Sequence, residues 1–229
     1  MGKISIKLAA LPVILLKPKQ GFESVKESAS LESGLVMALI LAILYALVST
    51  LELTLIESAG SIANLALAAL ITIILPMVGL LVFGWLSAKL AREVYKGTGD
   101  IGKTTCFLGY GAIVPLTLAI IRLAVIALTG VIPADVSGAV EYEVLSATVG
   151  KTAIMAGIAF FFLELIWKLY VNSHAVAAAN KIPLYKGAVI TILVGAISIM
   201  VVALIVGALF FFLNLAAPLN GISGYFAAI

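Results

Sequence analysis

The sequence predicts an all-α polytopic membrane protein, a bundle of five transmembrane helices preceded by an N-terminal interfacial segment. Three observations predict this class: 63% of the 229 residues are hydrophobic, only 11% are charged, and the mean hydropathy is +1.25. About a quarter of the residues in an ordinary soluble domain are charged, and they provide its polar surface. This chain has too few polar residues to form a water-facing surface around an apolar core, so the bilayer is its solvent.

Five stretches are apolar and long enough to cross about 30 Å of hydrocarbon, which takes about 20 residues. We expect spans at residues 35–55, 62–88, 106–128, 152–171 and 187–213. Residues 1–33 precede them as an arm whose apolar run is too short to span, so the arm is expected to lie at the membrane interface. Asn214 and Pro218 interrupt the last apolar run, and residues 214–229 are therefore expected to form an apolar tail.

Segments rich in lysine and arginine alternate along the chain with loops that contain few of them. The basic residues gather in the arm, between spans two and three, and between spans four and five: Lys3, Lys7, Lys17, Lys19, Lys26, Lys89, Arg92, Lys96, Lys103, Lys168, Lys181 and Lys186. The other two loops are mainly acidic, with Glu57, Asp135, Glu141 and Glu143, and with Lys151 at the far edge. Because an excess of Lys and Arg marks cytoplasmic loops, we expect a cytoplasmic N-terminus and an outer C-terminus, in the cell membrane if the chain is prokaryotic.

Ionisable side chains inside the spans are candidate functional residues, because such a group costs about 3 kcal/mol on insertion scales. At 1.5 Å per residue, Arg122 lies about 24 Å and Glu52 about 25 Å from the cytoplasmic side. This similar depth predicts an ion pair, or snorkelling of Arg122 to the outer interface, with a substrate or ion path as the alternative. Glu164 and Lys168 are four residues apart, which favours a boundary ion pair over a proton relay.

Prolines within the spans and lysines in the arm complete the candidate residues. Pro76 and Pro115 each remove a backbone hydrogen bond in mid-span and are candidate helix kinks. The arm mixes basic and apolar side chains, namely Lys17, Lys19 and Lys26 with Val13–Leu16, Phe22 and Val25. The three lysines are therefore candidate contacts to anionic lipid headgroups of the cytoplasmic leaflet.

The residue inventory predicts no catalytic, cofactor or metal site. Cys106 and His174 are the only cysteine and histidine, which excludes an internal disulfide and most metal or Ser–His–Asp arrangements. We expect Cys106 to be a small apolar residue at a helix end and His174 to lie in a solvated loop. Residues 97–104 satisfy the Gly-x-x-x-x-Gly-Lys-Thr pattern, but they lie between two spans rather than between a strand and a helix, so no nucleotide site is expected. The net charge of +3 belongs to the loops of a membrane protein, and no nucleic-acid partner is expected.

Three segments of this chain resemble the Yip1 domain family of five-span membrane proteins. They are residues 16–23 (LKPKQGFE) in the arm, residues 109–116 (GYGAIVPL) in span three and residues 164–170 (ELIWKLY) at the end of span four. The resemblance implies a non-enzymatic protein, and eukaryotic relatives are associated with Rab GTPases and with traffic between endoplasmic reticulum and Golgi. Those relatives carry a long soluble N-terminal region with an Asp-Leu-Tyr-Gly-Pro type motif. This chain has only residues 1–33 before span one and lacks the motif, so it is similar to the short prokaryotic members and Rab binding is not implied.

Two functional hypotheses follow from the sequence. The first is a non-enzymatic Yip1-like protein that organises the membrane or scaffolds other membrane proteins, with the bilayer and those proteins as partners. The second is a small transporter or channel that uses Arg122, Glu52 and Glu164. A polar cavity that reaches Arg122 or Glu164 favours transport, and a sealed bundle favours the scaffold. The sequence determines neither a substrate nor an oligomeric state.

Overall fold

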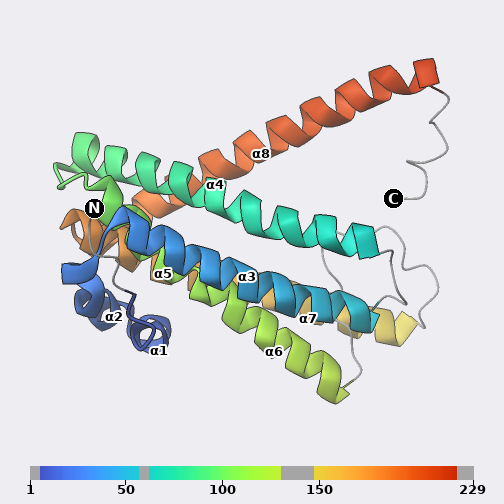
Figure 1. Ribbon diagram of the computed structural model, residues 1–229, viewed down its shortest axis with the longest axis horizontal. Coiled ribbons are helices and arrows are strands. Elements are labelled where there is room, and N and C mark those ends of the chain that lie inside the picture. The colour runs from blue at the N-terminus through green and yellow to red at the C-terminus, as the bar shows by residue number, and fades with distance from the viewer. Residues whose placement is uncertain (1–5, 57–61, 130–146, 221–229) are drawn as a thin grey trace.

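The computed structural model describes residues 6–56, 62–129 and 147–220, which form a bundle of helices (Figure 1). In chain order the elements are α1 (Ala10–Leu16), α2 (Pro18–Val25), the short 3-10 helix η1 (Lys26–Ser28), α3 (Leu31–Ile56), α4 (Ile62–Tyr95), α5 (Ile101–Gly111), α6 (Ile113–Thr129), α7 (Ala147–Asn180) and α8 (Leu184–Asn220). The described residues contain five helical stretches long and apolar enough to cross a membrane, with α5 and α6 together making one of them. The predicted fold class is confirmed.

The basic segments gather at one end of the bundle. The arm helices α1 and α2, the turn between α4 and α5 and the turn between α7 and α8 all lie at this end, which we call the arm end (Figure 1). The two turns are joined directly, because the Thr98 amide donates to the Asn180 carbonyl at 3.0 Å. Some residues used in the charge argument lie outside the described residues, namely Lys3, Glu57, Asp135, Glu141 and Glu143.

Helices α4 and α7 extend well beyond the C-terminal ends expected for their spans. Helix α4 reaches Tyr95, and α7 continues to Asn180 where a polar loop was predicted after residue 171. The loop prediction was wrong because residues 175–179 read Ala-Val-Ala-Ala-Ala, which favours a helix, and this segment packs into the protein core. His174 is accordingly a half-buried helix residue whose ring meets that of Tyr170 edge to face.

The predicted break at Asn214 and Pro218 is also absent, since α8 continues to Asn220. The surrounding residues are mostly apolar or alanine, and a proline two residues before a helix end removes only one backbone hydrogen bond. Residues 221–229 of the predicted tail lie outside the described residues.

Span three begins at Ile101, earlier than the expected residue 106, and it is not one continuous helix. Helix α5 ends at Gly111, Ala112 forms a turn, and α6 begins at Ile113. Pro115 explains the break, because its ring has no N–H to donate to the carbonyl of residue 111 and clashes with it in a continuous helix. The Ala112 amide instead bonds back to the Gly109 carbonyl at 3.3 Å. By contrast, α4 runs through Pro76 as one helix.

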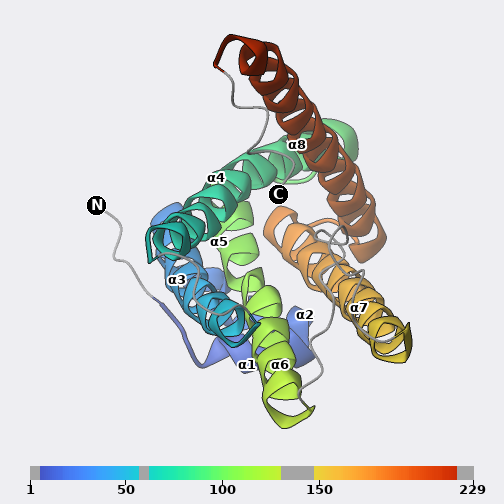
Figure 2. The same cartoon turned by 90° about the vertical axis from the view of Figure 1, so that its right-hand side faces the viewer.

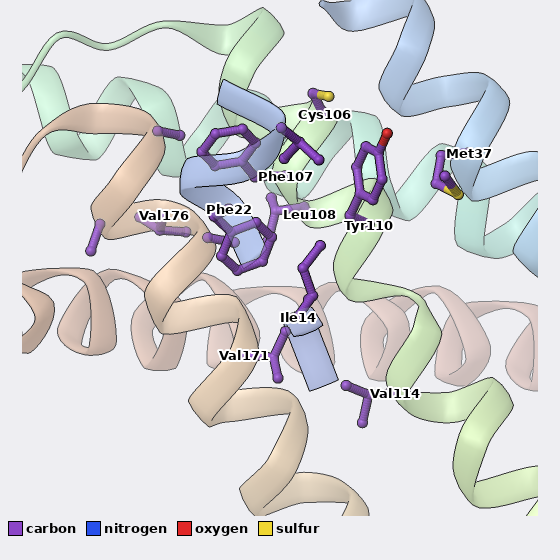
Figure 3. Close-up of a cluster of buried hydrophobic side chains, with 14 of the residues drawn as sticks. Ile14, Phe22, Met37, Cys106, Phe107, Leu108, Tyr110, Val114, Val171 and Val176 are labelled. Atoms are coloured by element: carbon purple, nitrogen blue, oxygen red, sulfur yellow. The ribbon is translucent and has the colours of Figure 1, made fainter. Parts of the chain in front are cut away.

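The arm packs into the protein core at the arm end (Figure 3). Phe22 of α2 is completely buried and stacks on Phe107 of α5, with ring centroids 5.1 Å apart. Ile14 of α1 is also completely buried. Two hydrogen bonds fasten the arm further, from the Trp167 Nε1–H to the Leu15 carbonyl at 3.2 Å and from the Lys7 amide to the Tyr110 hydroxyl at 2.9 Å. The arm is therefore a docked part of the fold.

Helices α3 and α5 touch through their backbones at a pair of glycines. A Cβ added at Gly109 would lie 2.5 Å from the Gly34 carbonyl oxygen, and one added at Gly34 would lie 2.3 Å from the Cys106 Cα. Cys106 is buried at this contact. It lies in the middle of α5 and not at a helix end as expected, because α5 already begins at Ile101. Small residues that let helix backbones approach are common in membrane bundles, and Gly34 and Gly109 allow the approach of α3 and α5.

We predict that Gly34→Ala and Gly109→Ala each destabilise the protein, because a methyl group at either site meets backbone atoms that cannot move aside. The expected cost is about 1–3 kcal/mol, typical of overpacking. Gly195→Ala is the matched control, since its added Cβ meets nothing within 4 Å and replacing a helical glycine by alanine gains about 0.5–1 kcal/mol. Thermal unfolding of the three variants in nanodiscs measures the difference. Equal midpoints for Gly109→Ala and Gly195→Ala would contradict the backbone contact.

Candidate functional site

Arg122 and Glu52 form an ion pair between α6 and α3. Arg122 Nε lies 2.5 Å from Glu52 Oε1, and Arg122 Nη2 donates to Glu52 Oε2 at 2.7 Å. The contact is bidentate, the strongest geometry for an arginine and a carboxylate. Glu52 is only 6% exposed. Comparison of depths along the helices predicted this pairing, and the structure confirms it.

Glu164 and Lys168 form the second ion pair, one helical turn apart on α7. Both side chains are about one-third to two-fifths exposed, at 33% and 43%. Their i,i+4 spacing predicted the contact. Lys168 lies closer to the arm end than Glu164, since α7 runs toward that end.

A cavity of about 490 Å³ lies between the helices and reaches Lys168 of the second pair. It is lined by α3, α4, the α5–α6 break, α7 and α8, through Ala38, Leu41, Ala42, Tyr45, Thr72, Pro76, Met77, Gly79, Leu80, Phe83, Leu108, Gly111, Ala112, Pro115, Lys168, Asn172 and Ser198. Most of the lining is apolar. Lys168 and Asn172, one turn apart on α7, bring an ammonium and an amide to it.

A second, much smaller cavity of about 20 Å³ reaches Arg122 and Glu164. It shares Tyr45 and Pro115 with the large cavity. A space of this size holds about one water molecule. The small cavity can hydrate Arg122 and Glu164, which both line it.

The remaining candidate residues occupy different places. Pro76 and Pro115 both line the large cavity. Lys17 and Lys19 are exposed at the arm end, whereas Lys26 pairs with Glu23 at 3.2 Å. Phe22 and Val25, expected beside these lysines at the lipid surface, are instead completely buried, because their side of α2 packs on the bundle.

The segment that matches a phosphate-loop pattern is a helix start. Asp100 caps α5, and its side chain accepts from the Lys103 amide at 2.9 Å. The Thr104 hydroxyl donates to the Asp100 carbonyl. The same hydroxyl accepts a hydrogen bond from the buried Asn180 Nδ2 at 3.0 Å. Hydrogen bonds of the helix cap and of α7 thus use several polar groups of this segment. Within the described residues no group of three or more metal-ligating side chains occurs.

Sequence reasoning missed two residues of this region. Asn172 lines the large cavity and Asn180 fastens α7 to α5, but both were assigned to a polar loop. An available signal was the alanine-rich run between them, which favours a helix and so places the two asparagines on it.

These features define the class of protein: an all-α polytopic membrane protein with five membrane-crossing stretches, a docked N-terminal arm and an Arg122–Glu52 ion pair between two of its spans. Comparison with protein families then gives a match to the Yip1 domain over residues 13–226. The match covers nearly the whole chain, so the protein belongs to the Yip1 family, as the three sequence segments indicated. Neither the comparison with curated proteins nor the comparison with solved structures gives a match.

Proposed function

We propose that this protein is a non-enzymatic membrane-organising protein that binds the anionic cytoplasmic leaflet through its arm. The observation that carries the proposal is the docking of the arm: one side is buried in the bundle, and the other presents lysines beside apolar side chains. Lys17 and Lys19 are exposed, and so are the neighbouring Leu8, Val13 and Leu16, the last with 77% of its surface accessible. A fixed surface of this composition suits an interface of headgroups and acyl chains.

The same arrangement supports the proposed orientation. The basic turns between α4 and α5 and between α7 and α8 lie at the arm end beside the arm lysines (Figure 1). Because lysine and arginine favour the cytoplasmic side, we place the arm end in the cytoplasm and the opposite end of the bundle outside. A rigid basic platform at the cytoplasmic surface also suits a scaffold for other membrane proteins, which are the further partners we propose.

The arm lysines are expected to select anionic lipid. Each lysine near an anionic surface contributes about 1 kcal/mol, so Lys17→Glu/Lys19→Glu removes at least about 2 kcal/mol of attraction. The protein is reconstituted in vesicles of phosphatidylcholine and phosphatidylserine. Electron paramagnetic resonance of spin-labelled lipids measures which species is immobilised on the protein. Wild type is expected to prefer phosphatidylserine, and the double variant to lose most of that preference.

Lys17→Arg/Lys19→Arg is the matched control, because it keeps both charges and should keep the preference. If the Lys17→Glu/Lys19→Glu and Lys17→Arg/Lys19→Arg variants prefer phosphatidylserine equally, the arm lysines do not bind anionic headgroups and the proposal fails. Unfolding midpoints of both variants should match wild type, since the two lysines are exposed and are not part of the buried arm contact.

A small transporter that uses Arg122, Glu52 and Glu164 is the second candidate. The observation in its favour is that the cavity at Arg122 and Glu164 adjoins the large one through Tyr45 and Pro115. Its volume of about 20 Å³ and the bidentate Arg122–Glu52 contact oppose a continuous path. Proton or ion flux into sealed vesicles that disappears on Glu164→Gln would favour transport over membrane organisation.

A further inference from the structure

We propose that the large cavity binds one glycerophospholipid from the leaflet on the arm side of the membrane. Its phosphate contacts Lys168 and Asn172, and one acyl chain fills the apolar remainder of the cavity. This intramembrane site is separate from the exposed arm lysines, and it does not depend on their binding the leaflet surface.

The dimensions of the cavity fit one lipid chain. Its volume of about 490 Å³ falls within the roughly 300–1,000 Å³ of small-ligand sites. Its lining on α4 extends from Thr72 to Phe83, a rise of about 16 Å at 1.5 Å per residue. The hydrocarbon core of a bilayer is about 30 Å thick. The cavity therefore extends over about one leaflet, the depth that a single acyl chain occupies.

We infer that the lipid enters sideways between α4 and α8, where two glycines border open space. A Cβ added at Gly79 of α4 or at Gly195 of α8 would meet nothing within 4 Å. Gly79 itself lines the cavity, and Gly195 precedes the lining residue Ser198 by one turn. Helix α8 also diverges from α3, α6 and α7 with distance from the arm end (Figures 1 and 2).

Lys168 and Asn172 provide the polar end of the site. The Lys168 ammonium carries three N–H donors, and the contact with Glu164 leaves donors for a second acceptor. A Cβ at Gly111 would lie 2.8 Å from Asn172 Oδ1, so the glycine makes room for the asparagine beside the α5–α6 break. Phosphate oxygens are acceptors that match both an ammonium and an amide N–H.

The helix break adds backbone polarity at the same place. Gly111, Ala112 and Pro115 all line the cavity, and Pro115 has no N–H for the Gly111 carbonyl. Irregular backbone at membrane depth is tolerated where it is buried in protein or lines a cavity. The break therefore sits where a polar headgroup, and not only a hydrocarbon chain, is accommodated.

A lipid fits these observations better than a transmembrane helix of a second chain. A helix crosses the full hydrocarbon thickness and is about 10–12 Å wide with side chains, whereas the lined length on α4 is about half that thickness. An apolar helix face also has no group for Lys168 and Asn172. A phospholipid satisfies both the length and the polar end.

Native mass spectrometry of the full-length protein tests the site. Protein delipidated in mild detergent is titrated with palmitoyl-oleoyl phosphatidylglycerol, and we expect one tightly bound lipid per chain. Gly79→Phe fills the cavity and should abolish that adduct. Gly79→Ala leaves most of the space and should retain it. Both variants should unfold at the temperature of wild type or above, because the added atoms at residue 79 point into open space.

Headgroup recognition has its own variants. Lys168→Gln should weaken phosphatidylglycerol binding about tenfold, the effect of one hydrogen bond between charged groups, while Lys168→Arg restores it. Binding of the matching diacylglycerol, which has no phosphate, should be weak and insensitive to Lys168→Gln. The Lys17→Glu/Lys19→Glu variant should still bind the single lipid in the cavity, although it loses the preference for phosphatidylserine at the membrane surface. The proposal is overturned if Gly79→Phe binds the lipid as well as Gly79→Ala, or if the cavity variants change dimerisation and leave lipid binding unchanged.

Discussion

Arg122→Leu is expected to destabilise the folded protein by about 3–5 kcal/mol, the usual cost of removing one partner from a buried ion pair. The variant leaves the Glu52 carboxylate, only 6% exposed, without the guanidinium that binds both of its oxygens. Reversible unfolding in mixed micelles or steric trapping in bicelles measures the loss. Glu52→Leu is expected to cost a similar amount, since it leaves the arginine charge in the span.

The double variant Arg122→Leu/Glu52→Leu distinguishes loss of the ion pair from nonspecific destabilisation by the substitutions. Replacing both members of a buried pair by apolar residues is often neutral or stabilising, so the double variant should recover most of the stability lost by either single change. Lys103→Leu, which removes a more exposed partner of Asp100 at 3.7 Å, should change stability by no more than about 1 kcal/mol. A double variant that loses the sum of the two single effects would contradict coupling between these residues.

Phe22→Ala is expected to release the arm from the bundle, at a cost of about 3–5 kcal/mol for a buried phenylalanine. Phe22 is completely buried and stacks on Phe107, so its removal opens a cavity between α2 and α5. The effect should appear first in the arm. Hydrogen exchange of α1 and α2, followed by mass spectrometry, should accelerate strongly, while exchange in α3 and α7 changes little.

Leu16→Ala is the control for the arm, because Leu16 is 77% exposed and its truncation removes no buried contact. Its exchange pattern and unfolding should match wild type to within about 0.5 kcal/mol. Equal exchange of the arm in Phe22→Ala and Leu16→Ala would show that the aromatic stack does not hold the arm. Loss of anionic lipid selection in Phe22→Ala would further connect arm docking with the proposed membrane function.

Local sequence signals predicted the interactions that depend on spacing along one helix or on depth. Glu164 and Lys168 are four residues apart, so helix geometry alone brings them together. Arg122 and Glu52 belong to different helices, but similar membrane depth left few partners for a charge in the outer half of span three. The docked side of the arm was not predicted, since an amphipathic segment packs equally well on lipid or on protein.

Composition and the positions of lysine and arginine determined that the chain is a five-span all-α membrane protein, because a bilayer requires long apolar helices. They also gave the charge asymmetry from which its orientation is proposed. Only the tertiary structure decided which apolar faces meet protein. It buried Phe22 and Val25, joined α3 and α5 at two glycines, and left a cavity lined by α3, α4, the α5–α6 break, α7 and α8. Hydrophobic residues suit lipid and protein alike, so hydropathy cannot distinguish these neighbours, and only packing shape does.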